Sequence, residues 1–306
     1  MTKTRNRSWR QKFTVVDVII YALVTAFILL VVFPLLNTVA LSFNNGRDAE
    51  AGGIYFWPRV FTLDNYSSIL SSPDFLMAAV VTVIRTVIGT VTALLFTAVF
   101  AYVVSKPNLA FRKFYMVLII IPMYFNGGLI PSYLLIRDLG LIDHFLVYIL
   151  PSLFSTFNVI IIMSFFREIP RALEESAIID GAGYLRIFFR IILPVSKPVM
   201  ATVCLFIAVG HWNAWMDNML YIQKAHHLDT LSFYFREIVQ AQEYLEKMIL
   251  ESGNAQMVEV FKEQQTATGL TLQNAAMIVS LFPIAITYPF LQKYFVKGVM
   301  VGSIKG

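Results

Sequence analysis

The chain is short of charged residues and of cysteine, and both shortages narrow the classes of protein that it can belong to. Only 14% of its 306 residues are Asp, Glu, Lys or Arg, whereas about 25% is usual for a soluble globular protein. Hydrophobic residues make up 58% of the chain, and the mean hydropathy is +0.68. The composition excludes an ordinary soluble domain and predicts an integral membrane protein.

Residue types that build reactive or metal-binding sites are also scarce. The single cysteine, Cys204, excludes an internal disulfide and a cysteine zinc site. Four histidines are scattered, and the neighbouring His226 and His227 lack metal-ligand spacing, so no metal site is predicted. No cluster of nucleophile, base and metal ligands is present, which predicts no catalytic residue and argues against a membrane enzyme. Basic residues are spread along the chain, which gives no indication of nucleic-acid binding.

Six apolar stretches reach the roughly 20 residues that a helix needs to cross a bilayer core of about 30 Å. The runs are continuously apolar rather than alternating, which favours helices over a β-barrel. The first run exceeds the apolar core of a signal peptide, about 7–15 residues, so we interpret it as a retained span. The expected fold is all-α with six transmembrane helices, at residues 15–43, 76–104, 114–136, 145–166, 199–222 and 270–295.

Basic residues fall unequally on the two sides of these spans, sixteen on one side and seven on the other. Because cytoplasmic loops carry the excess of Lys and Arg, the larger set and both termini are predicted to be cytoplasmic. The larger set is Lys3, Arg5, Arg7, Arg10, Lys12, Lys106, Arg112, Lys113, Arg167, Arg171, Arg186, Arg190, Lys197, Lys293, Lys297 and Lys305. The smaller set is Arg47, Arg59, Arg137, Lys224, Arg236, Lys247 and Lys262.

This orientation defines the predicted organisation of the chain. Its parts are a cytoplasmic tail (1–14), a first transmembrane helix (15–43), an outer loop (44–75), a core of five transmembrane helices (76–297) and a cytoplasmic tail (298–306). The core contains a cytoplasmic loop (167–198) and a larger outer loop (223–269). In the larger loop, REIVQAQEYLEKMILES has apolar residues at helical spacing. An acidic, partly helical loop of this length is expected to contact another protein, and a cap over the span ends is the alternative.

The cytoplasmic loop contains EESAIIDGAGYLRIFFRIILPVSKP, which is unusually charged for this chain. A charged residue at the bilayer centre costs at least about 2.5–3.5 kcal/mol on insertion scales, so the stretch is expected outside the membrane. Its first half is rich in helix-forming residues, and Gly181 then provides a left-handed position that ends a helix. Helical spacing resumes at Tyr184. A helix, a turn and a second helix suit insertion into a partner's cleft, and an amphipathic linker on the membrane surface is the alternative.

The same stretch resembles a known motif. Glu175, Ser176 and Ala177, then Asp180-Gly181-Ala182, then Ile192-Leu193-Pro194 resemble the EAA motif of ABC importer permeases, with Ser176 in place of an alanine. GGLIPSYLLIRDLGLID (127–143), GHWNAWMDNMLYI (210–222) and QKYFVKGVMVGSIKG (292–306) are similar to segments of carbohydrate importer permeases. Nearly the whole chain therefore resembles the permeases of maltose-type importers, and most closely the branch for complex oligosaccharides.

The resemblance implies a type I ABC importer permease fold with a coupling helix between the fourth and fifth spans. It implies a bacterial inner or plasma membrane location, a second permease subunit, two cytoplasmic ATPase subunits and an outer solute-binding protein. ATP and Mg²⁺ would be bound by the ATPase subunits, and the chain itself has no G-x-x-x-x-G-K-[ST] sequence. The residues expected to couple to the ATPase are Glu174, Glu175, Ser176, Ala177, Asp180, Gly181, Ala182 and Arg186.

Polar residues inside spans are candidates for an oligosaccharide path. On a continuous fifth helix, His211, Trp215 and Asn218 would share one face, and Asn213 and Asp217 another. The alternative is an interfacial aromatic belt. Arg85, alone in the second span, is expected to be structural and to face a helix partner or a carbonyl. The candidate path residues are His211, Asn213, Trp215, Asp217 and Asn126, with Tyr124 a weaker one.

An ion-coupled secondary carrier for small polar solutes is the main alternative function. Such carriers use carboxylates within the membrane and are commonly built from inverted repeats. The only acidic residues in the expected spans, Asp17 and Asp217, lie near span ends, and no inverted repeat is evident. The sequence therefore favours a permease driven by ATP.

Overall fold

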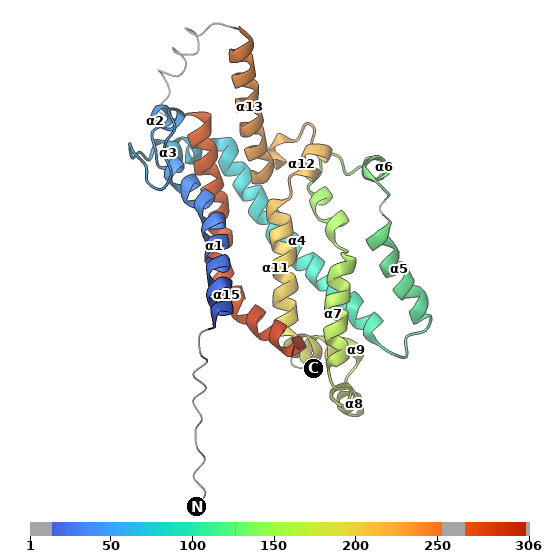
Figure 1. The fold of residues 1–306 in the computed structure, drawn as a ribbon. Helices are drawn as coiled ribbons and strands as arrows, with labels where there is room; N and C mark the ends of the chain where they lie inside the picture. The colour runs from blue at the N-terminus through green and yellow to red at the C-terminus, as the bar shows by residue number, and fades with distance from the viewer. Residues whose placement is uncertain (1–13, 126, 253–266, 304–306) are drawn as a thin grey trace, which may run out of the picture. The chain divides into compact units, whose positions relative to one another are not determined.

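The computed structural model describes residues 14–125, 127–252 and 267–303, which form helices, turns and one isolated bridge between Asn44 and Phe61. The mostly helical fold expected from the sequence is confirmed for these residues (Figure 1). The chain divides into two compact units, Met1–Tyr66 with Ala255–Ile278, and Ser67–Asn254 with Val279–Gly306. Each is described by itself.

In the first unit, the long helix α1 (Val15–Ser42) leads into a folded segment that contains α2 (Gly46–Glu50) and the start of α3 (Asp64–Leu70). Asn44 is fully buried, and its Oδ1 accepts hydrogen bonds from the N–H groups of Arg59 (2.7 Å) and Val60 (2.9 Å). Asn65 donates to the carbonyls of Ser42 (3.0 Å) and Asn44 (2.9 Å). Buried asparagines thus fold the segment after α1 back onto the end of that helix.

The second unit is arranged around α4 (Pro73–Ser105), which packs against α7 (Thr156–Glu168) and α11 (Lys197–Asn213) (Figure 1). Small residues of α4, Ala93, Ala98 and Ala101, are almost completely buried in the main hydrophobic core and permit close approach of the neighbouring helices. The remaining elements of this unit are α5 (Arg112–Tyr124), α6 (Leu129–Asp138), η1 (Phe145–Tyr148), η2 (Leu150–Ser152), α7 (Thr156–Glu168), α8 (Ala172–Ile179), α9 (Tyr184–Ile187), η3 (Phe188–Ile192), α10 (Leu193–Val195), α11 (Lys197–Asn213), α12 (Met216–Tyr221), η4 (His226–Leu228), α13 (Leu231–Ser252) and the later part of α15 (Gly269–Ser303).

Three of the predicted spans are continuous helices that are long and apolar enough to cross a membrane: Val15–Ser42, Pro73–Ser105 and the segment Gly269–Ile286 of α15. Three other candidates are bent pairs of helices. Arg112–Tyr124 and Leu129–Asp138 meet at 114°, Phe145–Ser152 and Thr156–Glu168 at 48°, and Tyr184–Val195 and Lys197–Asn213 at 85°. The helices predicted at residues 114–136 and 145–166 are therefore interrupted, and the one predicted at residues 199–222 is interrupted between Asn213 and Met216.

Local backbone chemistry accounts for these interruptions. Gly128, just before α6, has a φ of 88°, a conformation that β-carbon-bearing residues rarely adopt. Pro151 lies in the 3₁₀ turn η2 that precedes α7, where it cannot donate a backbone hydrogen bond. Ser196 separates α10 from α11. A hydropathy pattern predicts how long an apolar segment is, but it does not predict where the helix within that segment bends.

In the larger outer loop, the predicted helix is confirmed, because α13 covers Leu231–Ser252. Residues 253–266 of that loop lie outside the described residues, as do residues 1–13 and 304–306 of the two tails.

Candidate functional site

The charged segment between α7 and α11 starts with helix α8, which is followed by a turn at Gly181 and by the short helix α9. After α8, Gly181 has a φ of 77°. Its N–H donates to the carbonyl of Ile178 (3.0 Å), and the N–H of Ala182 donates to the carbonyl of Ala177 (2.9 Å). This pair of bonds around a left-handed residue is the Schellman motif that ends many helices. The turn predicted at Gly181 is confirmed.

One side of α8 is attached to the rest of the unit. Glu174 pairs with Lys106 at the end of α4, and the Lys106 Nζ lies 3.8 Å from the centre of the Tyr102 ring. Ala177 is 9% exposed and belongs to the hydrophobic core that includes Tyr102 and Phe188. The expectation that Ala177 faces a partner is therefore wrong, because α8 uses that small residue to approach its own core. Glu174 likewise has an ion-pair partner within the chain.

The other side of the segment is open. Its exposed polar side chains are Glu175, Ser176, Asp180 and Arg186, whereas Ala182 is partly buried. Beside them Ile179, Tyr184 and Leu185 are 85%, 70% and 72% exposed. Apolar side chains this exposed, surrounded by charged ones, form a surface suited to contact with another protein. We call the exposed residues of 175–186 the coupling surface.

A second candidate region is the break between α11 and α12. Helix α11 ends at Asn213, Ala214 is extended with a ψ of 125°, and α12 starts at Met216. Two carbonyls near the break find side-chain donors: the Ser232 hydroxyl donates to Trp212 (2.8 Å), and the Arg85 guanidinium donates to Ala214 (3.2 Å). The sequence predicted that His211, Trp215 and Asn218 share one face of a continuous helix. This prediction is wrong, because the helix is interrupted at Ala214.

Arg85 is the centre of the polar contacts at this break. Only 2% exposed, it pairs with Asp217 of α12 through both terminal nitrogens, and its guanidinium lies 4.3 Å from the centre of the Tyr148 ring. The expectation that Arg85 faces a carbonyl is confirmed by its bond to Ala214. Asp217, a candidate for the path, has both carboxylate oxygens engaged by Arg85.

Asn218 extends this network toward the outer loop. It is fully buried, and its Oδ1 accepts from the Tyr148 hydroxyl (2.8 Å) and from the N–H of Thr230 (2.6 Å). Its Nδ2 donates to Asp229 (2.8 Å). Tyr148 was not singled out from the sequence, because nothing nearby in the chain indicates a partner 70 residues away. The network holds the start of the larger outer loop on η1 and α12.

Asp143 makes a second attachment of that loop and was also missed from the sequence. It has a φ of 58°, and its Oδ1 accepts from the N–H groups of Gln223 (2.6 Å), Lys224 (2.9 Å) and Ala225 (3.2 Å). These donors, with that of Lys224 contributing most, lower the pKa of the Asp143 carboxyl. The sequence did offer a signal for a turn here, because Asp143 lies between two predicted spans and Asp is one of the few residues that tolerate the left-handed region.

The path candidates differ in accessibility. His211 is 5% exposed and lies over Gly89 so closely that a β-carbon there would be 2.4 Å from its ring. Asn213 is exposed. Trp215 is partly buried, with the Arg236 guanidinium 3.9 Å from the centre of its ring. Asn126 lies outside the described residues. Asn213 and Trp215 thus offer an amide and an aromatic ring at the break.

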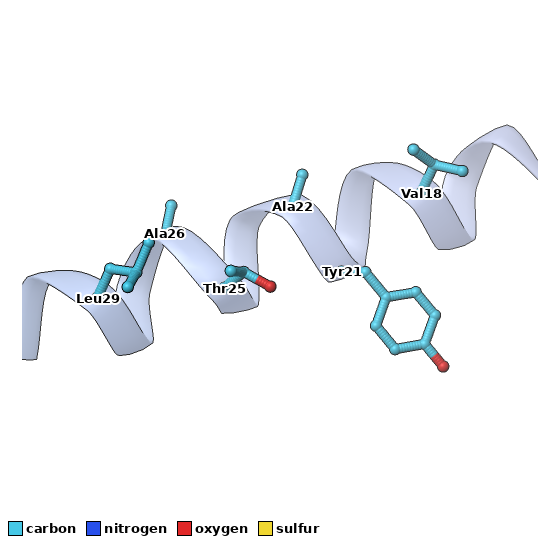
Figure 2. A pocket seen from close by; sticks show the side chains of 6 residues that line it. All are labelled: Val18, Tyr21, Ala22, Thr25, Ala26 and Leu29. Atoms are coloured by element: carbon cyan, nitrogen blue, oxygen red, sulfur yellow. The ribbon is translucent and has the colours of Figure 1, made fainter. Parts of the chain in front are cut away.

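A hollow on α1 in the first unit is mainly apolar, unlike the two candidate regions described above. Val18, Tyr21, Ala22, Thr25, Ala26 and Leu29 line it (Figure 2). All six come from one helix, so the hollow is an open surface and not an enclosed pocket. Since α1 buries only Ala40 and Ser42 within the chain, this side suits lipid or a neighbouring helix.

No family model matches the chain. Among curated proteins, LplC of Bacillus subtilis (strain 168) is 38% identical over 275 residues, which cover 90% of each protein. YtcP of the same bacterium, a polygalacturonan/rhamnogalacturonan transport system permease protein, is 36% identical over 290 residues, covering 95% of this chain and 98% of YtcP. Among solved structures, a chain of a bacterial ABC transporter involved in the import of the acidic polysaccharide alginate is 27% identical with a TM-score of 0.80. The match covers 96% of this chain and 100% of that one.

Proposed function

The chain belongs to the carbohydrate permease subunits of ABC importers, and from this membership we propose that it forms one half of a heterodimeric oligosaccharide permease. As a transport subunit it is not an enzyme, and ATP hydrolysis belongs to separate subunits of the importer. The names of YtcP and of the alginate importer support fragments of polysaccharides as the cargo.

We propose that six spans cross the bacterial cytoplasmic membrane with both termini in the cytoplasm. Three would be the continuous helices and two would be the bent pairs at residues 112–138 and 145–168, each counted as one span. The remaining span would be residues 199–222, because residues 184–195 belong to the cytoplasmic loop. The excess of basic residues at residues 1–14, 106–113, 167–198 and 293–305 supports this orientation. The outer side would then carry the loops at residues 44–75 and 223–269, where the solute-binding protein delivers its cargo. We propose that the larger loop contacts that protein.

The coupling surface is the observation that carries the proposed mechanism. We propose that α8 and the turn at Gly181 dock in a groove on one of two cytoplasmic ATPase subunits, which bind the ATP and Mg²⁺. The exposed Glu175, Ile179 and Leu185 would make the contact. The buried side of α8, through Glu174 and Ala177, would transmit its movement to α4 and the main core. Closure of the ATPases on ATP would then bias the permease between two conformations.

For the sugar path we propose Asn213 and Trp215 as lining residues. An amide can donate to and accept from sugar hydroxyls, and an aromatic ring can pack on a sugar ring. His211 and Asp217 would support the path from behind, because one is buried against Gly89 and the other is paired with Arg85. Asn126 keeps its place as a candidate from the sequence. Replacing Asn213 or Trp215 with alanine should reduce uptake while assembly of the complex is kept.

The two acidic residues that a secondary carrier would need are occupied in other ways. Asp217 pairs with Arg85, and the Asp17 carboxylate accepts from the N–H of Thr14 (2.8 Å) at the start of α1. Neither arrangement suggests a carboxylate that exchanges ions. ATP-driven import remains the function that these residues support best.

Glu175→Lys tests the coupling proposal, with Glu168→Lys as a matched control, since both side chains are exposed and belong to the same predicted cytoplasmic loop. Glu175→Lys should leave membrane insertion normal. It should weaken co-purification of the ATPase subunits or uncouple their activity from substrate, because it puts a positive charge in the first turn of α8 and on the contact. Normal substrate-stimulated ATPase activity in Glu175→Lys would reject the docking proposal.

A further inference from the structure

Two arginines lie near the break at Ala214, and they differ in their counter-charges. Arg85 is paired with Asp217. The guanidinium carbon of Arg236, in the second turn of α13, lies over the Trp215 ring, 3.9 Å from its centre. None of the ion pairs in the described part of the chain includes Arg236. Its buried Nε also has no hydrogen-bond partner there. Among the residues that the structure describes, no carboxylate pairs with the Arg236 guanidinium.

The neighbouring acidic side chains are engaged elsewhere. Asp217 is bound by Arg85, and Asp229 accepts from Asn218 (2.8 Å) and contacts His226 (3.2 Å). Glu237 follows Arg236 along α13 but forms no ion pair with it among the described residues, and burial, followed by the charge of Asp229, raises the pKa of its carboxyl. The local arrangement leaves the guanidinium as the group that can receive an anion.

The donors of the guanidinium determine what that anion can be. The Arg236 guanidinium carbon lies over the Trp215 ring, and its terminal nitrogens carry N–H groups that can pair with an anion. Those donors match the two oxygens of a carboxylate. The Trp215 ring can pack on a sugar ring, and the exposed Asn213, two residues earlier, can bond to hydroxyls. A carboxylate attached to a sugar ring satisfies all three groups.

We propose that Arg236 and Trp215 form a subsite for a uronic acid residue, so that the cargo is an acidic oligosaccharide. The inference rests on the proposed transport function and assigns the substrate class to the outer end of the same path. In this arrangement Arg236 pairs with the sugar carboxylate, Trp215 supports the ring, and Asn213 contacts a hydroxyl group.

The test compares uptake of acidic sugars and their neutral counterparts by the complete importer in proteoliposomes, with ATP and the binding protein present. The probes are trigalacturonate and trimannuronate, each beside the trisaccharide in which the carboxyl groups have been reduced to alcohols. Arg236→Gln should lower the uptake efficiency for an acidic probe by about tenfold or more, the size expected for a lost charge-assisted hydrogen bond. The neutral counterpart should change by less than about twofold, within the spread of an uninvolved surface substitution.

Two further variants separate the role of Arg236 from general charge effects. Arg236→Lys should keep part of the preference, because an ammonium retains the charge but not the two-pronged geometry. Lys224→Gln removes another cation of the outer loop that has no aromatic partner among the described contacts, and it should leave the preference unchanged. The binding protein is the same in every arm, so a changed ratio between acidic and neutral uptake reports on the permease.

Equal loss of acidic and neutral uptake in Arg236→Gln would mean that Arg236 only holds the structure, and an unchanged ratio would mean that it does not meet the carboxylate. Either result overturns the inference. It is also overturned if the wild-type importer takes up only the reduced trisaccharides, a result that leaves the proposed function intact. Absence of ATP-dependent uptake for every oligosaccharide would instead reject the proposed function itself.

Discussion

The turn at Gly181 and the break at Ala214 both redirect the chain, but different kinds of contact hold them. At Gly181 the two capping bonds join residues within the same short stretch, Gly181 to Ile178 and Ala182 to Ala177. At Ala214 the donor is Arg85, which lies 129 residues earlier in the chain. The first change of direction is a local motif, and the second requires that α4 and α12 have already come together. The two regions should therefore respond differently to substitution.

The largest expected effect is at the break. Arg85→Leu leaves the Asp217 carboxylate without its partner, and losing one member of a buried ion pair costs about 3–5 kcal/mol. The complex should be recovered poorly and unfold at a lower temperature. Arg85→Leu combined with Asp217→Leu should be more stable than Arg85→Leu alone, because it removes both charges. Thermal unfolding of the purified importer measures this, and strictly additive losses would contradict the account.

Gly181→Val should harm the turn without unfolding the unit. A β-branched residue at a φ of 77° is strained by about 1–3 kcal/mol. No neighbouring atom lies within 4 Å of the added β-carbon, so the effect comes from the backbone conformation. Transport should be lost, and Gly181→Asn should restore part of it because Asn tolerates the left-handed region. Gly183→Ala, which also has open space but a φ of −74°, is the control and should transport normally.

Gly89→Ala sharpens the comparison by testing another long-range contact near the break. The new β-carbon would lie 2.4 Å from the His211 ring and would force it to move. Overpacking of this kind costs about 1–3 kcal/mol. Gly210→Ala, next to His211 but with no atom within 4 Å, should be neutral or slightly stabilising. Equal unfolding temperatures for the two variants would show that the His211 ring adapts freely.

The smallest effect concerns Asp143 and pH. Its carboxyl pKa is lowered by the backbone donors of residues 223–225, so the carboxylate contributes stability fully above the ordinary pKa of 3.8. That contribution is lost as the pH falls through the lower pKa of the folded state. Asp143→Asn keeps an acceptor oxygen and tolerates the same backbone conformation, so its unfolding temperature should depend less on pH in this range. Parallel pH profiles for the two proteins would contradict this assignment.

The sequence was sufficient for features that depend on nearby residues. Apolar length predicted the helices α1, α4 and α15, helical spacing predicted α13, and Gly181 marked the turn after α8. It was insufficient where the deciding contact is distant. Nothing near Ala177 indicated that its side chain would be buried in the main hydrophobic core, and helical spacing through residues 199–222 gave no sign of the break at Ala214.

Around the candidate path, too, the sequence indicated what depends on one residue and missed what depends on distant contacts. Arg85 was expected to meet a carbonyl because a lone arginine within a span needs a partner. Its pairing with Asp217 and its contact with Tyr148 depend on how three separate elements pack, which no local pattern encodes. From the sequence Arg236 was counted only among the basic residues of a polar loop, because its aromatic neighbour Trp215 becomes known only from the packing.

The most direct test of the docking claim is a photo-crosslink from the coupling surface. Benzoylphenylalanine in place of Ile179, which is 85% exposed, should form an adduct with an ATPase subunit in the assembled importer. The same group in place of Phe111, 82% exposed in the turn before α5 and on the same predicted side of the membrane, is the control and should give little or none. An adduct at Ile179 that depends on the ATPase subunits is the predicted result. Equal yields at both positions, or adducts with lipid alone at Ile179, would contradict it.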